Sequence, residues 1–307
     1  MPSRPALHTL LAGAAILAFI SQSSFAQSAT PASHCSDYVN LANPKDFFPL
    51  IIDDVKLDGA ITLPASDLQE FVESLIHREK CVTSDWLSEI EEVPARAFWN
   101  DRGYYKVEVK AEAETTNDRS GITHAILTLH IKEGIQYRLK SIRFRKAVDP
   151  DDTSPLAGDP SFPRDQLRKL IPLEDGDLFS SDRIREGLDA LKYLYGRFGY
   201  IEFVATPNID VDEAKREISL TMELAESKQF RFSKVEVLGE PPLALRAIPS
   251  QFNEGRIVDM TALNDATKQI QSHAVCTRER SIQTRMSEKS GTVQITFDFR
   301  PCPPPDH

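Results

Sequence analysis

The sequence predicts an α+β protein made of tandem β-α-α-β-β modules, each a small three-stranded sheet with two helices on one face. Three observations predict it. A helix-like run ends in "DRGYYKVEVKAEAE" at Gly103, and a second ends in "RFGYIEFVATPNIDV" at Gly199. An alternating strand follows each corner, as "ITHAILTLHIKEG" and "REISLTMELAE". Another strand-like segment precedes each helical part. A segment order that recurs along a chain indicates repeated structural units.

The first unit is expected at residues 47–134. "PLIIDDVKLDG" predicts its opening strand, and "PASDLQEFVESLIHREK" predicts a helix with one apolar face. "SDWLSEIEEVPARAFWNDRG" predicts a second helical region, which Pro94 should kink or interrupt. We expect Trp86, Phe98 and Trp99 in the core, with an aromatic surface for a partner as the alternative.

The second unit is expected at residues 135–227. "YRLKSIRFR" predicts a strand, and "FPRDQLRKLIP" a short helix. Ser180 or Ser181 can cap the following helix, "SDRIREGLDALKYLYGRFG". This helix should stop at Gly199 with a positive φ, and "YIEFVATPNIDV" should leave as a strand. The structural corners are therefore expected at two pairs of residues: Gly103 with Tyr104, and Gly199 with Tyr200.

The third unit, residues 228–301, is expected to be a degenerate copy followed by a tail at 302–307. It has "FRFSKVEVLG", a helical "MTALNDATKQIQSHAV" and a closing "TVQITFDFRP". No Gly-Tyr corner is present in this unit, and terminal repeats are often atypical.

The N-terminus predicts export. "LLAGAAILAFI" is too short to span a bilayer comfortably, and "SQSSFAQS" offers a cleavage point after Ala26. Residues 1–26 are thus predicted to be a cleaved signal peptide, with a linker at 27–46; an uncleaved anchor is the rival interpretation. The predicted location is periplasmic. A formal net charge of −10 argues against nucleic acid as a partner.

The cysteines are expected to form disulfides. An oxidising compartment permits such bonds, and four cysteines allow three pairings. We favour the two that are local in sequence, Cys35–Cys81 and Cys276–Cys302. No CxxC spacing is present, which argues against redox or zinc chemistry.

The second unit resembles a POTRA (polypeptide-transport-associated) domain. The resemblance lies in "LEDGDLFSSDRIREGLDALKYLYGRFGYIEFVATPNIDVDEAKREISLTMELAES" followed by "FRFSKVEVLG". The matching positions are Gly176, Asp177, Ser180, Gly187, Leu188, Leu191, Tyr195, Gly199, Tyr200 and Pro207. Such domains are the periplasmic modules of outer-membrane barrel-assembly and two-partner-secretion transporters. Relatives usually carry a C-terminal β-barrel, whereas this sequence stops at "RPCPPPDH" and resembles the arm alone.

The resemblance implies a non-enzymatic scaffold. It would bind unfolded outer-membrane proteins, or a barrel-assembly or secretion partner, by β-augmentation at an open sheet edge, and would meet the membrane only through a partner. The edge is expected at Tyr200–Pro207, with five candidate binding residues: Tyr200, Ile201, Glu202, Phe203 and Val204. Inert edges on modules that act as spacers are one alternative. An anchored POTRA protein of the cell-division type is the other.

Enzyme and metal chemistry find little support in the sequence. His124 and His130 could share a metal only with a third ligand that the pattern does not identify, so a solvated strand face is the simpler interpretation. The acidic segment Asp149–Asp159 lacks the oxygen spacing of a calcium loop. No nucleophile elbow, HExxH or phosphate loop is present. We therefore predict no cofactor and no metal, and a periplasmic hydrolase remains the weaker alternative.

Overall fold

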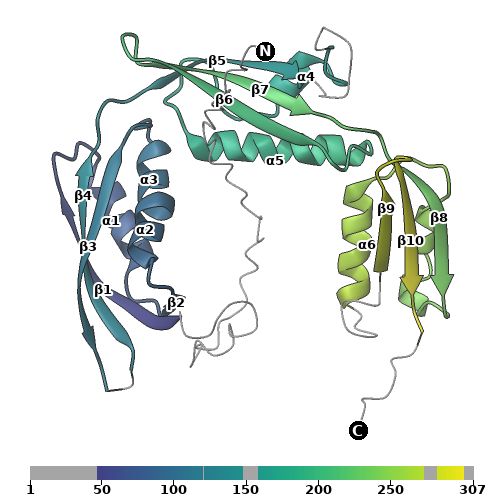
Figure 1. The fold of residues 1–307 in the computed structure, drawn as a ribbon, viewed down its shortest axis with the longest axis horizontal. Helices are drawn as coiled ribbons and strands as arrows, with labels where there is room; N and C mark the ends of the chain where they lie inside the picture. Colours follow the sequence, from purple (N-terminus) through teal and green to yellow (C-terminus); the bar gives the residue numbers. More distant parts are fainter. Residues whose placement is uncertain (1–46, 120, 148–157, 273–281, 301–307) are drawn as a thin grey trace, which may run out of the picture.

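The computed structural model describes residues 47–119, 121–147, 158–272 and 282–300, and it contains three small sheets, each with its own apolar core (Figure 1). We call these parts units one, two and three. Unit two lies across the top of Figure 1, and the other two units descend from its ends to form an arch. The helices of unit one and the longest helix of each other unit lie toward the inside of the arch, next to their sheets.

Unit one holds a sheet in the order β2-β1-β4-β3. Its strands are β1 (Phe48–Asp58), β2 (Lys80–Val82), β3 (Glu108–Asn117) and β4 (Thr123–Lys132). β1 is parallel to β4, and the other pairs are antiparallel. The prediction of three strands missed β2, because three residues are too few to show an alternating pattern.

The helices of unit one cover one face of this sheet. They are α1 (Ala65–Leu75), α2 (Trp86–Ile90), the π-helical turn η3 (Glu91–Ala95) and α3 (Arg96–Asn100). Pro94 lies inside the π-helical turn, so the predicted interruption is confirmed. Trp86 and Trp99 are buried and Phe98 packs against the same core, which confirms the core interpretation over the aromatic surface.

Unit two has the predicted element order. It contains β5 (Arg138–Lys146), α4 (Arg164–Arg168), α5 (Ser181–Arg197), β6 (Val204–Asp212) and β7 (Glu217–Ala225), with the sheet order β5-β7-β6. Four alternate side chains of β7 are buried against the helices: Ile218, Leu220, Met222 and Leu224. Ser180 caps α5 by accepting the Arg183 N–H at 3.2 Å.

Unit three repeats the sheet with less helix. Its strands are β8 (Arg231–Leu238), β9 (Ile282–Ser287) and β10 (Thr292–Asp298), in the order β8-β10-β9. Two short 3-10 turns, η4 (Leu243–Leu245) and η5 (Pro249–Gln251), stand where unit one has its first long helix, and α6 (Met260–Ser272) follows. The unit still buries its own core, which includes Phe230, Ile295 and Phe297.

Candidate docking edge and unit junctions

The open edge of unit two is β6. On the opposite edge, β5 is partly covered by its own chain. Leu139 donates its N–H to the Asp177 carbonyl oxygen at 2.9 Å and accepts the Gly176 N–H at 2.7 Å. The Phe144 carbonyl oxygen accepts a bond from Arg164 Nε at 3.1 Å. Among the described residues we find no comparable backbone bond on the free side of β6, so its main-chain groups remain available to another strand.

The edges of the other two sheets are covered to different extents. In unit one, the Ala111 N–H on edge strand β3 is donated to the Glu91 Oε1 atom at 2.7 Å, so a side chain occupies part of that edge. In unit three, β8 is covered by the segment before α6, because Phe232 donates to the Arg256 carbonyl at 2.9 Å. β9 is the other edge of that sheet and is described over only six residues.

Strand β6 exposes apolar side chains beside its free backbone. Val204 is 55% exposed and Ile209 is 40% exposed. Pro207 pairs with Met222 of β7 but has no N–H to donate. In an antiparallel pair, alternate residues direct their N–H groups to the neighbour and to the free side. The ladder between β6 and β7 is intact only if the nitrogen of Pro207 faces the free side of β6. The N–H groups of Ala205, Ile209 and Val211 then face the free side as well.

Only one of the five candidate edge residues lies in the strand. Phe203 donates its N–H to the Tyr200 carbonyl at 3.1 Å, which makes a turn before β6 begins at Val204. Phe203 stacks on Tyr195 with ring centroids 3.8 Å apart, and Tyr200 also packs against this core. Ile201 packs against the core of unit three, and Glu202 accepts a bond from Ser227 Oγ at 2.8 Å. The strand therefore starts later than predicted, because aromatic packing holds the corner.

Both corner glycines have the expected positive φ, 88° at Gly103 and 84° at Gly199. They also form the junctions between units. The Gly103 carbonyl accepts the Tyr137 N–H at 2.8 Å, and the Gly199 carbonyl accepts the Phe230 N–H at 2.8 Å. Each corner thus ends one unit and fixes the start of the next. A Cβ on Gly199 would lie 2.9 Å from the Phe230 carbonyl oxygen, so this junction requires glycine.

The junction between units one and two has additional polar contacts. Asp101 Oδ1 accepts the Asp182 N–H at 2.7 Å and the Ser181 Oγ–H at 2.9 Å, which satisfies the N-terminus of α5 from the neighbouring unit. Glu213 bonds to both Lys106 and the Tyr137 hydroxyl. Burial, aided by the Glu213 carboxylate, raises the pKa of Tyr137 to about 12. Sequence reasoning missed Asp101, since its partner lies in another unit.

A buried carboxylate recurs in units one and two. Glu133 follows β4 and accepts bonds from Trp99 Nε1 at 2.9 Å and from Thr62 Oγ1 at 2.7 Å. Glu226 follows β7 and accepts equivalent bonds from the Tyr195 hydroxyl at 2.7 Å and from Ser161 Oγ at 2.8 Å.

In each unit this carboxylate ties a helix and a loop to the end of a strand. Burial by itself raises the pKa of Glu226, but bonds from Ser161, Tyr195 and Lys146 outweigh burial and leave the pKa lowered. Both glutamates follow their strands, β4 and β7, at positions where the alternation of apolar residues predicts another apolar side chain. That break in the alternation is the signal in the sequence that marks the two glutamates.

The structure does not bring the two histidines together. His124 Nδ1 lies 2.9 Å from Asp53, and His130 Nδ1 lies 2.7 Å from Asp58. These hydrogen bonds raise the pKa of each histidine. Within the described residues no group of three His, Cys, Asp or Glu side chains could hold a metal ion.

Two other predictions fall wholly or partly outside the described residues. The acidic segment Asp149–Asp159 lies there except for its last two residues. Of the cysteines only Cys81, in β2, is described, so both disulfide pairings stay predictions. The described helices include none that is long and apolar enough to cross a bilayer.

Comparisons with known proteins agree with this geometry. A family profile named POTRA, described as "Surface antigen variable number repeat", matches residues 156–227, which span most of unit two. Unit two is therefore a POTRA domain. The fold of the chain is similar to the crystal structure of Haemophilus influenzae BamA POTRA3-5, with a TM-score of 0.56 at 15% identity over 82% of this chain and 96% of that one.

A sequence relative of the chain is the "Putative outer membrane protein assembly factor" of Treponema pallidum (strain Nichols). The two are 19% identical over 258 residues, which is 80% of this chain. The chain spans only 28% of that relative's length.

Proposed function

We propose that this POTRA-domain protein is a non-enzymatic periplasmic scaffold that holds extended polypeptide segments by adding them to the free edge of β6. The clients would be unfolded outer-membrane proteins or a loop of an assembly or secretion partner. The observation that carries the proposal is the uncovered backbone of β6, in contrast to the partly covered β5 on the other edge of the same sheet. Main-chain pairing tolerates many client sequences, which suits clients that share alternating strands and no motif.

The similarity to an outer membrane protein assembly factor supports the class of client. The exposed Val204 and Ile209 support contact with apolar side chains of an added strand. Affinity should be weak, because a short added strand buries little area and must be ordered on binding. It should change little with salt, since main-chain bonds and apolar contacts carry it.

The test is an NMR titration of the protein with an alternating peptide from an outer-membrane strand. We expect shifts of backbone amide signals within Val204–Asp212. The same peptide N-methylated at every residue should cause none, because neither of its edges can donate. Ile209→Pro removes a free-side donor and should weaken binding at least fivefold. Ile209→Val keeps the donor and the branched side chain, and should bind as the wild type does.

Two results would contradict the proposal. One is a set of shifted signals that omits β6 and clusters on another surface. The other is undiminished binding of the N-methylated peptide, which would show that main-chain pairing is not involved. The N-methylated peptide keeps the test decisive even if Ile209→Pro disturbs the pairing with β7.

A further inference from the structure

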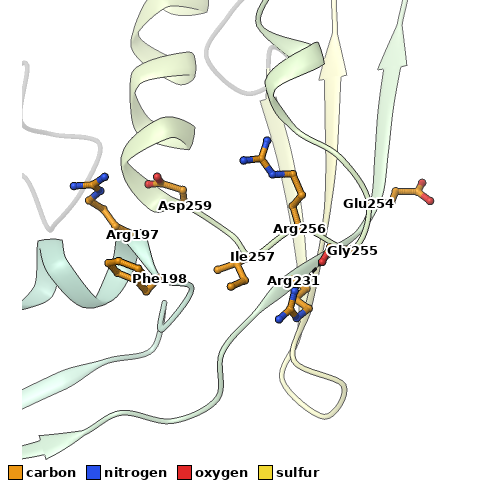
Figure 2. A pocket seen from close by; sticks show the side chains of 8 residues that line it. All are labelled: Arg197, Phe198, Arg231, Glu254, Gly255, Arg256, Ile257 and Asp259. Carbon is orange, nitrogen blue, oxygen red and sulfur yellow. Dashed lines mark hydrogen bonds between the residues drawn. The ribbon is translucent and has the colours of Figure 1, made fainter. Parts of the chain in front are cut away.

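A pocket lies at the junction between units two and three, and no residue of β6 is among those that line it. Its volume is about 670 Å3. The C-terminal end of α5, the start of β8 and the segment before α6 supply its lining, as Figure 2 shows. The lining residues are Arg197, Phe198, Arg231, Glu254, Gly255, Arg256, Ile257 and Asp259.

Three arginines of this pocket have no carboxylate partner in the part of the chain that the structure describes. Arg231 donates one bond to the Gly255 carbonyl at 3.0 Å, and Arg256 donates one to the Gln251 carbonyl at 3.3 Å. Arg197 lies 5.9 Å from the centre of the Tyr193 ring. A guanidinium has five N–H donors, so most of the donors in this cluster remain free for a ligand.

Among the described residues, the two acidic residues of the pocket form no ion pair with these arginines. Asp259 caps α6, because its Oδ1 atom accepts the Thr261 N–H at 2.9 Å and the Ala262 N–H at 3.2 Å. The Glu254 side chain points away from the arginines in Figure 2. The pocket lining has three arginines against two carboxylates, a formal charge of +1 in a chain with a net charge of −10. Guanidinium forks match carboxylate groups well.

The arrangement of the pocket indicates the form of the ligand. In Figure 2 the three guanidinium groups lie apart, around the side chains of Phe198 and Ile257. A single small anion would not reach all three. An extended segment could place successive carboxylates at the guanidinium groups and apolar side chains on Phe198, which is 44% exposed.

We propose that this pocket binds an acidic segment of a protein partner, in which carboxylates alternate with apolar side chains. The contact would hold a partner at the junction while the β6 edge stays free. It does not depend on the edge proposal, and the two differ in their response to salt. Binding at the pocket weakens as ionic strength rises, because exposed charge pairs are screened.

The test measures fluorescence anisotropy with a labelled ten-residue peptide that alternates glutamate with leucine, and every protein tested also carries Ile209→Pro, which weakens pairing at the β6 edge. The full protein should bind this peptide, and a matched peptide with glutamine for glutamate should bind at least tenfold more weakly. Arg197→Gln should weaken binding about fivefold, the scale of one partly exposed charge pair. Arg231→Gln and Arg256→Gln should act alike, but Arg197 is the primary variant because its side chain donates to no backbone carbonyl of the described residues.

The matched control is Arg143→Gln, which removes the same charge from an exposed position of β5. It should leave binding unchanged. The proposal is overturned if Arg143→Gln weakens binding as much as Arg197→Gln, since general charge attraction would then suffice. It is also overturned if the glutamine peptide binds equally well. Displacement of the peptide by inorganic phosphate, beyond the effect of sodium chloride at the same ionic strength, would show a small-anion site instead.

Discussion

Replacing Glu226 should destabilise unit two selectively. This carboxylate is 2% exposed and accepts bonds from the Ser161 N–H at 2.7 Å, Ser161 Oγ at 2.8 Å and the Tyr195 hydroxyl at 2.7 Å, with Lys146 Nζ at 3.2 Å. Glu226→Gln keeps the shape but exchanges one accepting oxygen for an NH2 group. The NH2 group cannot accept a bond, so a buried donor either loses its partner or, as a hydroxyl, must rotate to accept instead, and the ion pair with Lys146 is lost. Each bond to a charged group contributes about 1.5–3 kcal/mol, so we expect a loss of about 2–4 kcal/mol.

The assay must resolve one unit, because a protein with three cores need not unfold in a single step. Hydrogen exchange of α5, read by mass spectrometry, reports the opening of unit two. Glu226→Gln should accelerate exchange in Ser181–Arg197 and leave unit one unchanged. Glu223→Gln is the matched control on the outer face of the same sheet, where its exposed pair with Arg145 contributes at most about 1 kcal/mol.

The effect should also depend on pH. The pKa of Glu226 is lowered in the folded state, so its contribution is present above its unfolded pKa and is lost as pH falls through the folded pKa. The wild type should therefore lose stability in unit two below about pH 4.3, the ordinary glutamate value. Glu226→Gln should lose less over that range. The reasoning would be refuted if the free energy of opening of unit two in Glu226→Gln lay within about 0.5 kcal/mol of the wild-type value at pH 7.

The remaining predictions concern the corners, export and thiols. Gly199→Val should lower the free energy of unfolding by more than about 1 kcal/mol, since it meets a positive φ and a close carbonyl; an unchanged melting temperature would contradict this. Gly187→Ala, expected from helix propensity alone to be mild, should instead destabilise, because a Cβ there lies 2.3 Å from Ile171 Cδ1; denaturant melts would measure it. N-terminal sequencing of the exported protein should start near Gln27, and retention of the full-length chain in the inner membrane would support the anchored alternative. Thiol titration after oxidative export should find no free cysteine, whereas peptide mapping that leaves Cys276 and Cys302 unpaired would remove that pairing.

The periodic parts of the fold could be predicted from the sequence. The alternation of Ile218, Leu220, Met222 and Leu224 and the apolar face of α5 follow from local chemistry, and so do the glycine corners. The start of β6 could not be predicted in this way. Tyr200 and Phe203 carry strong strand propensity, but their rings pack around Tyr195 and hold a turn until Val204.

The polar contacts across the junctions were also beyond sequence reasoning. Asp101 looked like an ordinary helix-end residue, because its partners at the N-terminus of α5 are 80 and 81 residues away. The arginines of the junction pocket come from three separate segments, and no local pattern joins them. Glu133 and Glu226 could have been noticed in the sequence. Each is a charged residue at a position where the alternation of apolar residues along the strand predicts a buried apolar side chain.

The repeat explains why comparable edges need not share a role. Each unit begins its sheet at the corner of the one before, so the same backbone geometry recurs, and side chains decide which edges stay open. In unit one, the Glu91 carboxylate accepts the Ala111 N–H of edge strand β3. In unit two, Pro207 removes one donor from β6, which blunts association with another copy of the strand while the donors on either side of it remain. An edge that is open but interrupted favours short, reversible pairing with an added strand over permanent extension of the sheet, which is what the proposed scaffold would need in order to release a client.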